Sequence, residues 1–311
     1  MQAFEPVYLR SSSSSRLRLQ AEKSGASLQE CCLCPRQCHA DRTAGETGYC
    51  RTGELAVVAS YDAHFGEEEP LVGQNGSGTI FFSYCNLLCN FCQNYGISHA
   101  GEGQPVSDEQ LAWIMLRLQD HGCHNINFVT PSHLVPQIIR SVSLAAEKGL
   151  RIPLVYNTSG YDRVETLRLL DGVIDIYMPD FKFWDPDVGQ LTCNAPDYPQ
   201  HARAALKEMH RQVGDLVLDE NGIAQRGLLV RHLVLPENMA GTSDVMKFIA
   251  GHISANTYVN IMAQYRPCGS AHQVPGLDRS ITTREYQAAI ESARSQGITR
   301  LDQRRRVFVL R

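Results

Sequence analysis

The chain has 311 residues, enough to bury a substantial core in one barrel-like domain or in two smaller domains. Its net charge is -4 and it has no long run of Lys or Arg, so the composition gives no reason to expect a nucleic acid or a membrane as partner. No apolar run reaches the roughly 18 residues that span a bilayer, and the N-terminus lacks the apolar centre of a secretory signal. We therefore expect a cytoplasmic protein.

The N-terminal quarter divides into two parts. Residues 1–28 are rich in Ser and Arg without an apolar face, and we expect a flexible leader there. Residues 29–75 form a Cys-rich segment. Because eleven cysteines without an export signal are unlike a disulfide framework, we expect thiols that are available to metals. The plausible metal ligands are Cys31, Cys34, Cys38 and Cys50. Cys32 is either a spectator or a substitute for Cys31.

Four thiolates imply a closed metal site. Structural zinc and an auxiliary iron-sulfur cluster both accept four cysteines, and the spacing leaves the two open. The acidic stretch "HFGEEEPLVGQNGSG" that follows is interpreted as a solvated loop, in which His64 and Glu67 are weak site candidates.

Residues 76–311 alternate short β-rich runs with amphipathic helical patterns, which is typical of a parallel sheet built from βα units. Two capping boxes, Ser107 with Gln110 and Thr282 with Glu285, predict helix starts. Residues 216–227 carry a turn and are interpreted as a hairpin. The predicted strands lie at 79–84, 125–130, 153–159, 174–180, 228–236 and 258–265.

Six βα units are too few for a closed eight-stranded barrel. The predicted fold is therefore α/β, a partial (β/α)6 TIM-like barrel with a small Cys-rich N-terminal segment. Polar residues lie at or just past the ends of several predicted strands, including Asn157, Asp180 and Lys182. Because functional residues of such folds lie at the carboxyl edge of the strands, we expect the reactive site there.

The first predicted strand leads into "CNLLCNFC", which places Cys85, Cys89 and Cys92 within eight residues and offers no fourth cysteine nearby. A cubane cluster has four irons to ligate, so three thiolates leave one iron open. A structural zinc site needs four ligands and usually draws them from paired CxxC units. The triplet therefore favours an open-site [4Fe-4S] cluster over zinc.

This stretch resembles the CxxxCxΦC signature of the radical S-adenosylmethionine (radical SAM) superfamily, with Phe91 as the aromatic residue before the last cysteine. The resemblance implies a [4Fe-4S] cluster on the three cysteines, with its free iron chelated by the amino and carboxylate groups of S-adenosylmethionine. It further implies reductive cleavage of this cofactor to a 5'-deoxyadenosyl radical, in a cavity that excludes water.

From "CCLCPRQC" to the C-terminus, the chain resembles proteins related to pyruvate formate-lyase activating enzyme. The motifs "YNTSGY", "MPDFKFWD", "VRHLVLP" and "MAQYRP" each match at a strand end. The resemblance implies that Asp180, Lys182 and Arg231 lie near the cofactor, and we expect Phe91 and Asn157 to contact it as well. Asn157 stands where the activating enzymes carry an aspartate, which is a departure from their pattern.

A larger departure follows the second predicted strand. The superfamily usually places Gly-Gly-Glu-Pro there to hold the amino group of the cofactor, whereas this chain reads "FVTPSHLVP". Thr130, Ser132 and His133 would have to replace the glutamate. A histidine at such a position is more often a cap or a packing residue than a ligand.

The expected function is that of a radical SAM enzyme of the oxidoreductase type. It would depend on a one-electron reductant protein such as a flavodoxin or ferredoxin, and it would activate a partner by forming a glycyl radical. Two alternatives stay open, the radical modification of a small molecule or peptide, and a non-catalytic iron-sulfur or zinc scaffold. A scaffold would need only the cysteines and not the polar strand ends.

Overall fold

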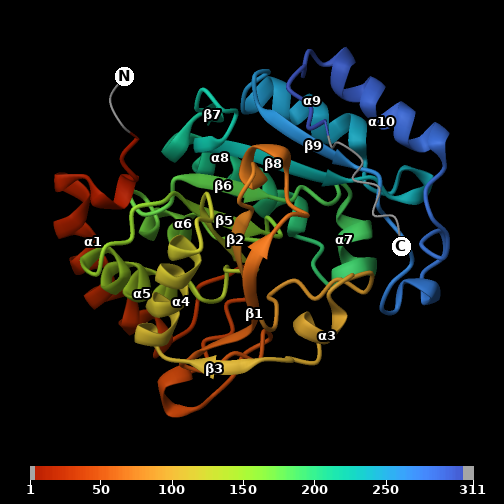
Figure 1. The fold of residues 1–311 in the computed structure, drawn as a ribbon. Coiled ribbons are helices and arrows are strands. Elements are labelled where there is room, and N and C mark those ends of the chain that lie inside the picture. The colour runs from red at the N-terminus through yellow and green to blue at the C-terminus, as the bar shows by residue number, and fades with distance from the viewer. Residues whose placement is uncertain (1–3, 304–311) are drawn as a thin grey trace, which may run out of the picture.

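A computed structural model describes residues 4–303 (Figure 1). The strands are β1 (Ala56–His64), β2 (Ser77–Phe82), β3 (Gln104–Val106), β4 (Ile126–Val129), β5 (Leu154–Thr158), β6 (Ile176–Pro179), β7 (Val217–Leu218), β8 (Ala224–Leu233) and β9 (Tyr258–Met262). The helices are α1 (Ser11–Ser24), α2 (Glu69–Val72), α3 (Tyr95–Ser98), α4 (Asp108–Asp120), α5 (Val135–Glu147), α6 (Val164–Leu169), α7 (Pro186–Cys193), α8 (Tyr198–Val213), α9 (Thr242–His252) and α10 (Thr283–Ser295).

Six strands pair in parallel in the order β2-β4-β5-β6-β8-β9, and they match the six predicted strands. On the far side of β2 the sheet continues with β1 and β3, which pair antiparallel. The sheet does not close, so the partial (β/α)6 barrel is confirmed. β1 lies in this sheet, although the sequence analysis assigned its residues to the Cys-rich segment.

Local sequence explains where several elements begin. Both predicted capping boxes are present, since the Ser107 and Thr282 side chains accept hydrogen bonds from the N–H groups of Gln110 and Glu285 at the starts of α4 and α10. The predicted hairpin is formed by β7 and β8. Every residue of β5 and β6 is buried, as expected for parallel strands covered on both faces.

The concave side of the sheet is filled in part by the loop between β1 and β2. Leu71 of α2 is fully buried and packs with residues of the neighbouring strands, among them Val155, Ile176, Met178 and Leu229. Figure 1 shows this loop, drawn in orange, lying across the strands beside β8. Its insertion fills the end of the barrel opposite the carboxyl ends of the strands.

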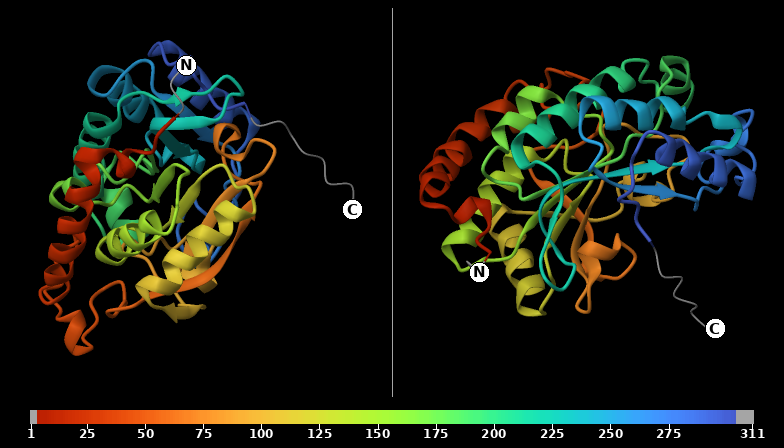
Figure 2. Two further views of the ribbon diagram at one scale, coloured as in Figure 1. Left: turned by 60° about the vertical axis from the view of Figure 1, so that its left-hand side comes forward. Right: turned by 90° about the horizontal axis from the view of Figure 1, so that it is seen from above.

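Within residues 4–28 the chain packs on the barrel, in contrast to the flexible leader predicted for residues 1–28, of which residues 1–3 lie outside the described residues. Residues 11–24 form α1, whose Leu17 is buried, and the views in Figure 2 place this helix alongside α5. Before it, the Val7 N–H donates to Asp175 Oδ1 at 2.7 Å and the Tyr8 hydroxyl donates to Ile152 O at 2.9 Å. The sequence gives little indication that this segment packs on the barrel, because the packing depends on a few buried side chains and on hydrogen bonds with backbone groups.

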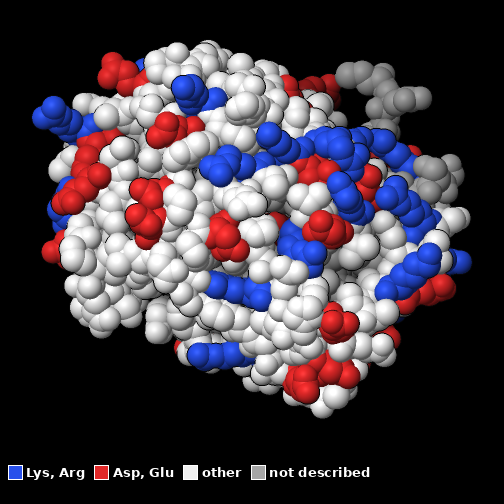
Figure 3. All heavy atoms as spheres, turned by 180° about the vertical axis from the view of Figure 1, so that it is seen from behind, with Lys and Arg blue, Asp and Glu red and all other residues white. Residues whose placement is uncertain are grey.

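Basic and acidic side chains are interspersed on the face opposite the view of Figure 1, and Lys and Arg form a band across it (Figure 3). Because Asp and Glu lie within the band, its field is partly neutralised. Within residues 4–303, no helix is both long and apolar enough to cross a bilayer.

Asp175 connects the N-terminal segment to the barrel and is fully enclosed. Burial raises the pKa of its carboxyl to about 7, although the N–H groups of Val7 and Leu154 donate to it. Between the ordinary pKa of about 4 and pH 7, the folded state therefore holds a proton that the unfolded state has released. The free energy of unfolding thus falls as the pH rises through this window, by at most about 1.4 kcal/mol per pH unit from this group.

We expect Asp175→Asn to flatten this dependence, as measured by urea unfolding in reducing buffer from pH 5 to pH 8. Asp120→Asn, at an exposed carboxyl, is the control and should keep the wild-type profile. A wild-type profile in the Asp175 variant would show that this carboxyl does not titrate in the window.

Candidate functional site

A cavity of about 150 Å³ lies at the carboxyl ends of the parallel strands. Its lining joins the cysteine loop after β2 to polar residues at the carboxyl ends of β4, β5 and β6 and to an arginine of β8. These include Cys85, Cys89, Cys92, Thr130, Asn157, Thr158, Ser159, Asp180, Lys182 and Arg231. Segments separated by almost 150 residues in the sequence therefore meet at one site, as the parallel topology predicts.

The cysteine loop turns sharply after β2. Tyr84 and Leu88 adopt positive φ angles of 68° and 55°, which bend the chain on either side of Cys85. Two donors point at sulfur atoms in the loop, since the Leu87 N–H lies 3.3 Å from Cys85 Sγ and the Ser98 hydroxyl lies 3.2 Å from Cys92 Sγ. Such donors stabilise thiolates, so the fold of the loop favours Cys85 and Cys92 in the thiolate form that binds metal.

Burial raises the pKa of Cys85, to about 12, and that of Cys92, whereas the pKa of Cys89 is raised first by its hydrogen bond to Cys193 and then by burial. The side chain of Cys193, at the end of α7, hydrogen-bonds to Cys89 but does not line the cavity. Metal binding to these residues would therefore release protons.

Three thiols that line one cavity fit the donor set of an open-site iron-sulfur cluster. Throughout the part of the chain that the structure describes, no three His, Cys, Asp or Glu side chains are arranged to hold a single metal ion.

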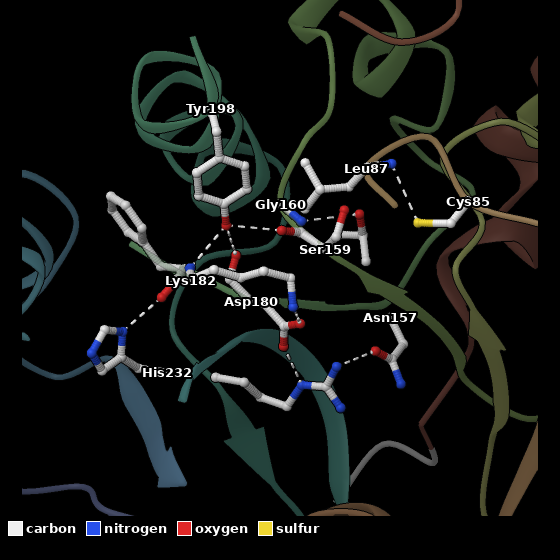
Figure 4. A network of polar contacts seen from close by, with 12 residues as sticks. Cys85, Leu87, Asn157, Ser159, Gly160, Asp180, Lys182, Tyr198 and His232 are labelled. Atoms are coloured by element: carbon white, nitrogen blue, oxygen red, sulfur yellow. Dashed lines mark hydrogen bonds and ion pairs between the residues drawn. The ribbon is translucent and has the colours of Figure 1, made fainter. Parts of the chain in front are cut away.

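Asp180 is the centre of the polar network in the cavity (Figure 4). One carboxylate oxygen accepts from Lys182 Nζ at 2.6 Å, and the other accepts from Arg231 Nε at 2.8 Å. The same guanidinium donates through Nη2 to Asn157 Oδ1 at 2.7 Å. One arginine thus connects β5, β6 and β8 at the floor of the cavity, and the predicted site residues of three strands are brought together.

The charges of this network stabilise one another. Burial alone would raise the pKa of Asp180, but Arg231 and Lys182 outweigh it and hold that pKa below its usual range. Burial alone would lower the pKa of both cations, but Asp180 outweighs it and both pKa values lie above their usual range. All three groups are therefore ionised near neutral pH.

Tyr198 and Gly160 support the network, and sequence reasoning missed both roles. The Tyr198 hydroxyl, from α8, contacts the carbonyl oxygens of Ser159 and Asp180 and accepts from the Lys182 N–H (Figure 4). Gly160 has a φ of 79°, and a Cβ there would run into the Asp180 carbonyl oxygen. The glycine of "YNTSGY" is a signal that could have been interpreted as such a close approach.

The sequence predictions after β4 divide in two. Thr130 lines the cavity, with a φ of 63°. Ser132 is buried and shares a hydrogen bond of 2.9 Å with Thr158 Oγ1. His133 is also buried, its Nε2 lies 3.1 Å from the Ser83 carbonyl, and burial lowers its pKa to about 3. The structure therefore supports a packing role for His133 in place of the predicted cofactor contact.

Phe91 also lies away from the cavity lining. Its ring is buried and packs edge-on against Tyr265, with the ring centroids 6.1 Å apart. It therefore holds the cysteine loop against the segment that follows β9, which is a packing contact rather than the predicted cofactor contact.

The acidic run before β2 was interpreted as a solvated loop, and this is wrong for two of its three glutamates. Glu68 is 1% exposed and its Oε1 accepts from Asn260 Nδ2 at 2.7 Å. Glu67 bonds to His64 at 2.8 Å and lies 3.9 Å from Arg231 Nη1. The reason is the insertion of Leu71, which draws the preceding residues under the cavity. Glu67 therefore provides a third contact for the cavity arginine.

The family signature matches at this site. Residues 79–222, from β2 to the β7–β8 turn, match the Radical SAM superfamily. A protein of Methanocaldococcus jannaschii, named "Uncharacterized protein MJ0674", is 31% identical over 292 residues, which cover 91% of this chain and 79% of that protein. The chain belongs to the radical SAM superfamily. The family typically binds a [4Fe-4S] cluster and S-adenosylmethionine, and the cysteines and strand-end residues described above are those that would hold them in this radical SAM protein.

A solved structure is also similar in part. It is described as "Crystal structure of HydG: A maturase of the [FeFe]-hydrogenase", and it matches with a TM-score of 0.46 and 13% identity. The match covers 70% of this radical SAM chain and 48% of that chain, so this chain spans about half of the length of the HydG structure.

We expect Gly160→Ala to be more destabilising than Gly222→Ala. Both glycines have a φ of 79°, but Gly222 has open space where its Cβ would lie. Gly222→Ala should lower the free energy of unfolding by roughly 1 kcal/mol for the backbone conformation alone. Gly160→Ala should cost roughly 1–3 kcal/mol more, because the methyl group displaces Asp180. Urea unfolding of both variants measures the difference, and equal costs would show that the close approach is not required.

Proposed function

We propose that this protein is a radical SAM enzyme that cleaves S-adenosylmethionine and takes a hydrogen atom from a glycine of a partner protein. The observation that carries the proposal is the meeting of Asp180, Lys182 and Arg231 with the three cysteines around one cavity. A metal scaffold would require the cysteines alone, whereas here three strands contribute charged or amide groups.

The residues of the chain have distinct tasks in this proposal. Cys85, Cys89 and Cys92 would hold the cluster, which when bound supplies the electron for cleavage of the carbon-sulfur bond of S-adenosylmethionine. Arg231 presents several fixed donors and suits the carboxylate or the ribose of the cofactor. Asp180 fixes Arg231 and Lys182 in place, and the buried surroundings exclude water from the reacting groups.

The glycine of a partner protein is proposed as substrate because the motifs at four strand ends resemble those of pyruvate formate-lyase activating enzyme. Radical modification of a small molecule or peptide is the second candidate. It is favoured by the loop after β4, where Ser132 and His133 are turned into the protein and no carboxylate takes the place of the usual glutamate.

The proposal includes a one-electron reductant protein, of the flavodoxin or ferredoxin type, as partner. It also places the protein in a reducing compartment such as the cytoplasm, which suits eleven cysteines that form no disulfide in the structure.

Cleavage of the cofactor can be tested directly. After anaerobic reconstitution with iron and sulfide, addition of dithionite and S-adenosylmethionine should give 5'-deoxyadenosine, quantified by chromatography and mass spectrometry. Alanine at Cys85, Cys89 or Cys92 should abolish the product, because each thiolate holds one iron. Cys123→Ala, at an isolated buried cysteine, is the control and should retain it. A wild-type protein with a full cluster and no product would favour the scaffold.

The identity of the substrate is tested with a glycyl-radical enzyme. Incubation of the reduced protein with S-adenosylmethionine and purified pyruvate formate-lyase should give a glycine-centred radical resonance by electron paramagnetic resonance. The Cys89→Ala variant should give none. Formation of 5'-deoxyadenosine without this resonance, for this and other glycyl-radical enzymes, would favour the small-molecule or peptide substrate.

A further inference from the structure

A second group of thiols lies in the Cys-rich segment, outside the cavity. The backbone folds Cys31 back on the end of its own loop, since the Cys31 N–H donates to Ala40 O and the His39 N–H donates to Cys31 O, each at 3.0 Å. Gln37 and His39 flank Cys38 with positive φ angles of 42° and 54°. A loop with so many tight turns and little regular structure is typical of small metal-binding segments.

The thiols of this loop are near neighbours. Cys34 is buried, and Cys50, Cys31 and Cys38 all lie near enough to interact with it electrostatically. The Tyr49 N–H lies 3.2 Å from Cys38 Sγ, and a Cβ on Gly48 would lie 2.7 Å from the same sulfur. The chain around Cys50 is therefore folded closely over Cys38.

Cys32 lies near Cys31 and Cys38 but contacts the exposed ring of His39. Its Sγ lies 3.5 Å from His39 Nδ1, and that ring also bonds to Glu30 at the surface. Cys31, in contrast, lies 3.9 Å from the guanidinium of Arg42. Cys31 also interacts with both Cys34 and Cys50, which favours it over Cys32 as the fourth thiol.

Arg42 provides an independent reason to expect negative charge here. Its side chain is 1% exposed, and it donates to Gly53 O at 2.7 and 2.8 Å and to His133 O at 2.7 Å. Among residues 4–303 no carboxylate forms an ion pair with it. A buried guanidinium is costly without a compensating anion. Four thiolates around either Zn²⁺ or a [4Fe-4S] cluster carry a net negative charge, and they would lie beside this cation.

Arg36 connects the same loop to the radical SAM cysteines. It lies between Cys34 and Cys38, and its guanidinium donates to the carbonyl oxygens of Asn86, Leu87, Cys193 and Asn194 at 3.1, 3.4, 2.8 and 2.5 Å. The first two of these lie between Cys85 and Cys89. The third belongs to the residue whose thiol bonds to Cys89. Arg36 also lies over the Tyr49 ring, 3.8 Å from its centroid. Arg36 thus binds the backbone just before Cys89 and the backbone of Cys193, whose thiol contacts Cys89.

We propose that Cys31, Cys34, Cys38 and Cys50 bind a second metal centre, either zinc or an iron-sulfur cluster, and that Arg36 couples this centre to the loop of Cys85 and Cys89. The second centre does not depend on cofactor cleavage. The coupling rests on the proposed cluster at Cys85, Cys89 and Cys92. Within each group, the sulfur atoms would have to approach one another on metal binding. In the described residues, neither group is already arranged to hold a single metal ion. An ordered second centre would fix Arg36, and Arg36 would fix the carbonyls that shape the first loop.

The second centre is tested in a full-length variant that lacks the first one. A Cys85→Ser/Cys89→Ser/Cys92→Ser variant, purified anaerobically, should retain about one zinc or about four irons with sulfide, measured by inductively coupled plasma mass spectrometry and a sulfide assay. Which metal is present distinguishes the two forms of the centre. Adding Cys34→Ser and Cys38→Ser should remove it, whereas adding Cys32→Ser should not.

Absence of stoichiometric metal from the triple variant would overturn the proposal, and so would metal that survives the Cys34 and Cys38 substitutions. A second measurement needs no substitution. In metal-loaded wild-type protein, Cys31, Cys34, Cys38 and Cys50 should resist alkylation, and removal of the metal should expose them together, as mapped by peptide mass spectrometry. Alkylation of these four at equal rates with and without metal would also overturn it.

The coupling is tested with Arg36→Gln. This variant should keep the metal of the second centre but lose iron from Cys85, Cys89 and Cys92 to a chelator about tenfold faster, a typical effect of removing an outer partner of a metal site. Arg163→Gln is the matched control, because Arg163 also contacts the Cys-rich segment, at Cys32 O, and its other partner is Glu165 of α6 rather than the first loop. Equal rates of iron loss in wild type and the Arg36 variant would refute the coupling.

Discussion

The carboxylate of Asp180 is the interaction on which the candidate site depends. Each of its oxygens binds one cation, Lys182 or Arg231, and through Arg231 it reaches Asn157 and the neighbourhood of Glu67. Neither cation would be stable in this buried position alone, because removing one partner of a buried pair typically costs about 3–5 kcal/mol. The carboxylate therefore allows two positive side chains to face the same cavity as three cysteines.

Both ends of the barrel contribute residues that support this charge network. At the carboxyl ends, the topology brings the residues that follow β2, β4, β5 and β6 to one edge. At the other end, the loop between β1 and β2 fills the concavity with Leu71 and places Glu67 under Arg231. The acidic run is thus part of the support of the site, and it differs from a solvated loop because a single buried leucine anchors the segment.

The radical SAM cysteines and the N-terminal cysteines belong to one connected region. Arg36 and Arg51 both extend from the Cys-rich segment to carbonyl oxygens next to the first cysteine loop, at Asn86 and Leu87 and at His99. The docked helix α1 and the bond between Val7 and Asp175 fix the chain that leads into this segment. The N-terminal part of the protein is therefore built onto the barrel and contributes to the shape of its reactive edge.

The sequence by itself determined the parallel βα architecture, the cysteine triplet and the strand-end positions of Asn157, Asp180, Lys182 and Arg231. These are local signals, since strand periodicity, capping boxes and ligand spacing are each contained in short stretches of chain. Only the tertiary structure decided which polar residues face the cavity. It turned His133 and Phe91 into the protein, buried Glu67 and Glu68, added Tyr198, and docked the N-terminal helix. The physical reason is that these outcomes depend on partners more than ten residues away, and a side chain's own sequence neighbourhood does not specify whether such a partner will be there.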